Sequence, residues 1–75
     1  MSVLFGKTKK MLEDKEAEIK LNLSNNYKDT AYKGYLEFVQ LINDLKENGK
    51  IGDRDFEKLS YKVEDYKKIF KNYLR

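Results

Sequence analysis

The sequence contains no cysteine and no histidine. Without cysteine, neither a disulfide framework nor a thiolate metal site can support the fold. Without histidine, the side chain that most often serves as a general base or a transition-metal ligand is missing. Ser24 and Ser60 therefore have no histidine to activate them as nucleophiles. These absences predict a protein that is not an enzyme and that holds no cofactor and no metal.

Proline and tryptophan are also absent, and no apolar run approaches the roughly 20 residues that a membrane-spanning helix needs. The apolar start at residues 1–5 is too short for a secretory signal. A chain of 75 residues, 39% of them charged, predicts one domain near the size at which a single core becomes marginal. We expect a cytoplasmic protein, and the excess of lysine over arginine favours a bacterial source.

The C-terminal segment has the clearest helical pattern. Its apolar residues are spaced alternately three and four apart: Phe56, Leu59, Val63, Tyr66, Phe70 and Tyr73. Asp53 is the predicted N-cap, and lysines in the last turns complement the helix dipole. This pattern predicts a helix over residues 53–74.

The middle segment has a wider apolar face. Its predicted core positions are Ala31, Tyr35, Phe38, Leu41, Ile42 and Leu45, and Tyr32, Leu36 and Val39 widen the face. A face this wide predicts contact with two neighbouring helices. Asn25 and Asn26 signal a turn before the segment, and Gly49 is suited to the end of a helix. Gly34 in mid-helix marks a candidate close crossing. We predict a helix over residues 27–48.

The first segment is ambiguous between two periods. Leu12, Ile19 and Leu23 suit one face of a helix, which Met11 can join, whereas residues 17–23 also alternate as in a strand. Its many helix formers and the lack of a partner strand favour a helix over residues 7–24. Its acidic residues Glu13, Asp14, Glu16 and Glu18 are expected to face lysines of the third segment. The fold class predicted is therefore all-α, an antiparallel three-helix bundle forming a single domain over residues 1–75.

The stretch DLKENGKIGDRDF, residues 44–56, resembles the calcium-binding loop of an EF-hand. Four residues fall at loop positions 1, 5, 6 and 12, namely Asp44, Asn48, Gly49 and Asp55. However, Lys46 places an ammonium at position 3, and Gly52 offers no side-chain oxygen at position 9. The stretch is better interpreted as a helix junction than as a metal site.

The same stretch resembles SHOCT, a short bacterial helical-hairpin motif. The residues that carry the resemblance are Leu45, Gly49, Ile51, Phe56 and Glu57. Gly52 stands where the motif usually has threonine. The resemblance covers roughly a third of the chain. It implies a helix–turn–helix packing unit and no chemistry.

The remaining candidates for function are surfaces. Tyr32 and Tyr61 lie off the core pattern, and exposed tyrosine is characteristic of protein–protein interfaces. We therefore predict an interaction surface on the second and third helices that includes Tyr32, Val39 and Tyr61. Its partner is expected to be another protein or a second copy of the chain, as a homodimer.

The alternative is a nucleic-acid-binding regulator that uses a basic face of the third helix. Its candidate contacts are Lys58, Lys62, Lys68 and Lys71. The net charge of +3 is low for this function, and Glu64 and Asp65 interrupt the face. A membrane contact through the apolar residues 3–5 and the lysines after them is also disfavoured, because the segment is too short to anchor stably. Protein interaction is the favoured hypothesis.

Overall fold

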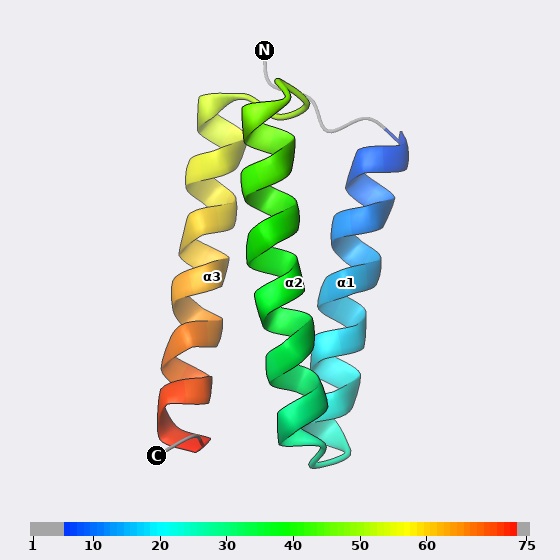
Figure 1. The fold of residues 1–75 in the computed structure, drawn as a ribbon, viewed down its shortest axis with the longest axis vertical. Coiled ribbons are helices and arrows are strands. Elements are labelled where there is room, and N and C mark those ends of the chain that lie inside the picture. The colour runs from blue at the N-terminus through cyan, green and yellow to red at the C-terminus, as the bar shows by residue number, and fades with distance from the viewer. Residues whose placement is uncertain (1–5, 74–75) are drawn as a thin grey trace.

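The computed structural model describes residues 6–73, which form three α-helices joined by two short connections (Figure 1). The helices are α1 (Gly6–Ser24), α2 (Lys28–Glu47) and α3 (Asp53–Tyr73). Each runs antiparallel to the one before it, so the predicted all-α three-helix bundle is confirmed. The predicted helix boundaries differ from these by one residue at most, and the predicted end at residue 74 lies outside the described residues.

The helix interpretation of the first segment is confirmed. Leu12 and Ile19 are buried on one side of α1, and Leu23 packs against the core. Leu21, which a strand would place on the same face as Ile19, is instead 62% exposed. Met11 is 45% exposed rather than joining the core.

Helix α2 lies between α1 and α3 and supplies the largest share of the core (Figure 1). The buried hydrophobic residues are Leu12 and Ile19 from α1, Ala31, Tyr35, Phe38, Ile42 and Leu45 from α2, Ile51 from the second connection, and Leu59, Tyr66 and Phe70 from α3. Burying one large apolar side chain of this kind stabilises a fold by about 1.5–3 kcal/mol. The two-sided apolar face predicted for α2 is therefore present.

Gly34 lies where α1 packs closely against α2. A Cβ atom at this position would lie 3.1 Å from Glu18 Oε2 and 3.2 Å from Ile19 Cγ1. The absence of a side chain lets Ile19 pack directly on the backbone of α2, so the close crossing expected from the sequence is confirmed.

The first two helices end in the same hydrogen-bonding pattern. After α1, the Tyr27 amide donates to the Asn22 carbonyl at 2.8 Å, and Asn26 has a φ of +65°. After α2, the Lys50 amide donates to the Leu45 carbonyl at 2.8 Å, and Gly49 has a φ of +72°. Both are Schellman turns, in which a left-handed residue satisfies the last helical carbonyls.

The predicted N-cap of α3 is wrong by one residue. Asp53 is the first residue of the helix, and the Gly52 carbonyl before it accepts the Phe56 amide at 2.9 Å. The Asp53 carboxylate instead accepts a hydrogen bond from Lys46 Nζ at 2.8 Å, which lowers the pKa of Asp53. Lys46 and Asp53 thus join the end of α2 to the start of α3.

Among residues 6–73, no helix has the length and apolar composition needed to cross a bilayer.

Replacing Gly49 with alanine is expected to lower the free energy of unfolding by about 1 kcal/mol or slightly more, because a Cβ atom is strained at positive φ. Urea denaturation followed by circular dichroism measures the change. The matched control is Asn48→Ala, since Asn48 has an ordinary φ of −86°. Equal stability of the two variants would contradict the assignment of Gly49 as the residue that ends α2.

Candidate interaction surface

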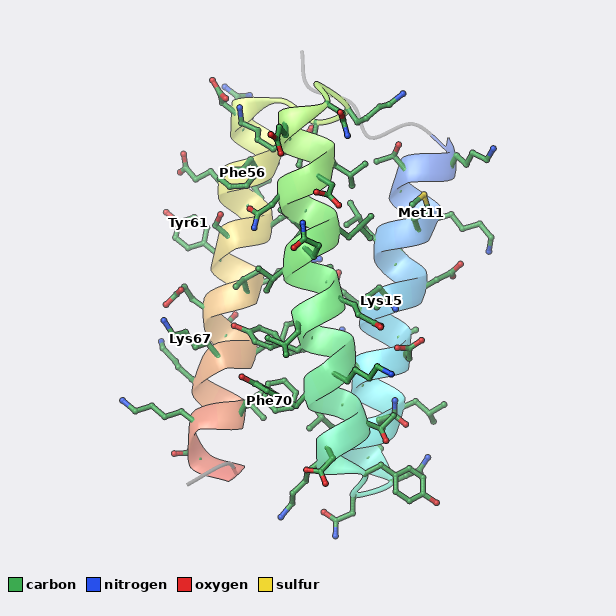
Figure 2. All side chains as sticks on the ribbon, viewed as in Figure 1. Met11, Lys15, Phe56, Tyr61, Lys67 and Phe70 are labelled. Carbon is green, nitrogen blue, oxygen red and sulfur yellow. The ribbon has the colours of Figure 1, made fainter. Side chains whose placement is uncertain are left out.

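An open, largely apolar surface lies between the first half of α2 and the last turns of α3. It is a groove lined by Tyr32, Tyr35, Leu36 and Phe70, with Lys67 and Lys71 at its edge. We call it the aromatic groove. In Figure 2, Phe70 lies between α2 and α3, and Lys67 lies about one turn earlier, on the side of α3 away from α2.

Three rings form the floor of the aromatic groove. Tyr32 stacks on Tyr35 with centroids 5.9 Å apart, and Phe70 lies 5.4 Å from Tyr32 and 5.2 Å from Tyr35. Tyr35 and Phe70 are buried, whereas Tyr32 is half-buried and reaches the surface. Ring pairs at these separations add about 0.5–1.5 kcal/mol beyond the area that they bury. The floor is therefore a cluster of three packed aromatic rings.

The edge of the aromatic groove is basic. Lys67 and Lys71 are four residues apart on α3, so their side chains stand one turn apart on the same face. No acidic residue lines the groove, although Glu64 is near enough to act on Tyr35. The pKa of Tyr35 is raised, first by burial and then by the negative charge of Glu64. Leu36, on the α2 side, remains 48% exposed.

A polar network joins α1 to α3 on another side of the bundle. Glu16 is buried, and it accepts hydrogen bonds from the Tyr66 hydroxyl at 3.1 Å and from Lys62 Nζ at 3.0 Å. The pKa of Tyr66 is strongly raised, first by burial and then by the negative charge of Glu16 and the hydrogen bond to it. The network holds α1 against α3.

The junction of α1 with α2 carries exposed ion pairs. Lys15 donates to Glu37 at 2.9 Å and lies 3.4 Å from Glu18, and Figure 2 shows it pointing between the two helices. The hydrogen bond with Glu37 raises the pKa of Lys15 and lowers that of Glu37. Of the acidic residues expected to face α3, Glu16 does so, whereas Glu18 pairs with Lys15 and Asp14 pairs with Lys10.

The three residues predicted as an interaction surface do not lie together. Tyr32 is part of the aromatic groove, and Val39 is half-buried against the core on the same helix. Tyr61 is 66% exposed and points away from the bundle on the far side of α3 (Figure 2). The fold therefore retains Tyr32 as a candidate contact, covers much of Val39 and separates Tyr61 from both.

The four lysines predicted to contact nucleic acid are spread around α3. Lys58 and Lys62 share one face because they are four residues apart, and Lys62 is already paired with Glu16. Lys71 lines the aromatic groove, and Lys68, three residues before it on a neighbouring part of the helix surface, does not line it. The fold does not gather them into one basic face.

The stretch that resembles an EF-hand serves as a helix junction. Asp44 accepts a hydrogen bond from Gln40 at 2.9 Å, and Lys46 is held by Asp53. Ile51 is buried between the two helices that it connects. Residues 6–73 contain no group of three or more acidic side chains arranged to hold a metal ion.

Two features of the surface were missed by reasoning from the sequence. Glu16 faces a lysine of α3 as expected, but its burial was missed, although it stands four residues after Leu12 and three before Ile19, on the buried face of α1. That spacing was a usable signal. Leu36 was predicted to widen the core face of α2, but it is 48% exposed. The sequence pattern cannot show whether a residue at the edge of an apolar face is covered by a neighbouring helix or left exposed.

Comparison of the chain with family models, with curated proteins and with solved structures finds no match. Residues 45–57 comprise the end of α2, the connection and the start of α3.

Replacing Tyr66 with phenylalanine is expected to lower the free energy of unfolding by about 1–2 kcal/mol at pH 7, because Glu16 loses a buried donor. Tyr61→Phe is the matched control, and its exposed hydroxyl predicts almost no change. Urea denaturation measures both. A loss shared equally by the two variants would refute the role given to the Glu16 network.

The raised pKa of Tyr66 predicts that the stability of the protein depends on pH in the alkaline range. Above about pH 10, an unfolded tyrosine loses its proton, whereas the raised pKa keeps folded Tyr66 protonated. The unfolded state then binds fewer protons, so the free energy of unfolding falls as the pH rises from about 9.5 to 11. Tyr66→Phe is expected to fall less steeply than the wild type. Parallel pH profiles for the two proteins would contradict this prediction.

Proposed function

We propose that the protein is a small helical interaction module that binds another polypeptide through the aromatic groove. The groove combines an apolar floor with the side-chain amines of Lys67 and Lys71. This combination suits a partner segment that presents apolar and polar side chains together. The cytoplasmic location expected from the sequence is part of the same proposal.

The observation that carries the proposal is the exposure of Leu36 beside the three packed aromatic rings. Leu36 is 48% exposed, although Tyr32, Tyr35 and Phe70 lie in the same groove. A single exposed leucine is ordinary, but apolar groups that gather around a concave aromatic floor are typical of binding sites. Tyrosine in such a position is also a frequent energetic centre of protein interfaces.

The nucleic-acid alternative stays a prediction. It was based on lysines of α3 acting as one face, and the pairing of Lys62 with Glu16 removes one of them from a free role. Of the remaining lysines, Lys68 and Lys71 are neighbours near the end of α3, whereas Lys58 lies near its start. This distribution gives less support to phosphate binding than the groove gives to polypeptide binding.

Replacing Leu36 with aspartate is expected to abolish partner binding without unfolding the protein. Immobilised wild-type protein is incubated with a lysate of the source organism, and retained proteins are quantified by mass spectrometry. Proteins bound through the groove should fall about tenfold or more with Leu36→Asp, because a buried carboxylate in an apolar interface costs binding energy.

The matched control is Tyr61→Ala, an exposed aromatic on the far side of α3. It is expected to retain the same proteins as the wild type. Circular dichroism checks that both variants are folded. Identical sets of retained proteins for Leu36→Asp and the wild type would rule out the aromatic groove as the binding surface.

A further inference from the structure

A second open groove lies between α1 and α2, on the other side of α2 from the aromatic groove. Its volume is about 540 Å³, against about 330 Å³ for the aromatic groove. The two grooves share no lining residue. We call the second one the acidic groove, because two apolar side chains and four carboxylates line it: Met11 and Leu41, with Asp14, Glu18, Glu37 and Asp44.

The ion pair between Lys15 and Glu37 sets the register of the two helices along the acidic groove. Lys15 Nζ lies 2.9 Å from Glu37 Oε1. Because α1 and α2 are antiparallel, the residue four positions before Lys15 lies level with the residue four positions after Glu37. These two residues are Met11 and Leu41. Their side chains therefore form one apolar patch across the groove.

The apolar patch is open to solvent. Met11 is 45% exposed, and Leu41 is half-buried where it packs against the core. In Figure 2, Met11 lies about one turn from Lys15 on α1, and Lys15 points between α1 and α2. Methionine is flexible and polarisable, so it adapts to apolar side chains of different shapes. The patch can therefore receive an apolar side chain of a partner.

Two carboxylates flank the apolar patch. Asp14 follows Met11 by three residues, and Asp44 follows Leu41 by three residues. The two helices run in opposite directions, so these carboxylates lie on opposite sides of the patch, each about 4.5 Å from it along the bundle axis. A partner that fills the patch therefore meets a negative charge at either end, roughly 9 Å apart along that axis.

Neither flanking carboxylate is neutralised by a residue of the groove. Asp44 accepts a hydrogen bond at 2.9 Å from the side-chain amide of Gln40, which carries no charge. Asp14 lies 3.6 Å from Lys10, and both side chains are largely exposed, so this pair contributes little. Asp14 and Asp44 can therefore accept a cation from a partner.

The one cation among the described residues that line the acidic groove is held elsewhere. Lys15 lies between Glu37 at 2.9 Å and Glu18 at 3.4 Å, and it leaves the two aspartates beside the patch uncompensated. Four carboxylates thus stand against one ammonium group, in a chain whose net charge is +3. The groove is therefore a local negative surface on a basic protein.

We propose that the acidic groove binds a basic amphipathic helix of another polypeptide. An apolar side chain of that helix packs on Met11 and Leu41, and its lysine or arginine side chains pair with Asp14 and Asp44. Residues three or four positions before and after the apolar contact lie on the same helical face and are separated by a rise of about 9–10.5 Å. This rise matches the spacing of the two carboxylates. Docking of an amphipathic helix in a groove is a common mode of peptide recognition.

The acidic groove and the aromatic groove differ in charge. The aromatic groove has Lys67 and Lys71 at its edge, whereas the acidic groove presents carboxylates. The negative charge of the acidic groove favours cationic segments and disfavours acidic ones. The two grooves are therefore expected to select different partner segments, and binding in one does not depend on binding in the other.

Peptide binding followed by NMR and by fluorescence anisotropy tests the proposal. The probe is a fluorescein-labelled, alanine-rich helical peptide in which a leucine follows one arginine by four residues and precedes another by three. It should shift the amide signals of Met11, Asp14, Leu41 and Asp44, and its affinity should fall as salt is added. The same peptide with glutamate in place of both arginines should bind about tenfold more weakly or less.

Charge variants assign the binding to the acidic groove. Asp14→Asn with Asp44→Asn should weaken binding of the arginine peptide about fivefold or more, because two rim ion pairs are lost. The matched control is Glu13→Gln with Glu47→Gln, which removes the same charge from exposed positions outside the groove. It should change the affinity by less than about twofold, since distant exposed charges are screened.

A second pair of variants tests the apolar patch. Met11→Gln should weaken binding of the arginine peptide by about threefold or more, because the leucine of the peptide loses an apolar contact. Leu21→Gln is the matched control, since Leu21 is exposed on α1 and does not line the groove. Circular dichroism checks that every variant is folded.

Equal affinity for the arginine and glutamate peptides would overturn the proposal. So would an equal effect of the two charge variants, or amide shifts confined to the aromatic groove around Tyr32 and Leu36. Shifts of the acidic groove that depend on protein concentration without any peptide would assign the groove to a second copy of the chain and would also overturn it.

Discussion

Helix α2 has to bury two sides of its surface, and the arrangement of the other helices follows from this requirement. Phe38 near its middle and Ala31 in its first turn are fully buried, with α1 packed on one side and α3 on the other. Gly34 allows α1 to approach closely, with Ile19 against the backbone of α2. The ring cluster around Phe70 sets the approach of α3. A middle helix with a narrow apolar stripe would hold only one neighbour.

Placing α2 in the middle leaves α1 and α3 with little direct contact, and a polar network takes over that role. Glu16 reaches both Lys62 and Tyr66 on α3. A buried carboxylate without these partners would cost several kilocalories per mole, so the network also restricts how the helices can be paired. This arrangement leaves one groove lined by residues of α1 and α2 and another lined by residues of α2 and α3.

The helices and much of the core were predictable because they depend on short-range patterns. The spacing of Leu59, Tyr66 and Phe70 identified the buried face of α3, and Gly49 identified the end of α2. The N-cap of α3 was misplaced by one residue because Asp53 found a partner in Lys46 of the preceding helix. Capping preferences are local, whereas that ion pair depends on where the chain folds back.

The sequence by itself determined that this chain forms three amphipathic helices, and that the stretch from residue 44 to 56 is a junction between two of them. Only the tertiary structure decided which surface residues come together. It combined Tyr32, Leu36 and Phe70 into one groove, and it left Tyr61 alone on the far side of α3. Neighbours along one helix follow from its period, but neighbours across helices depend on how the helices pack.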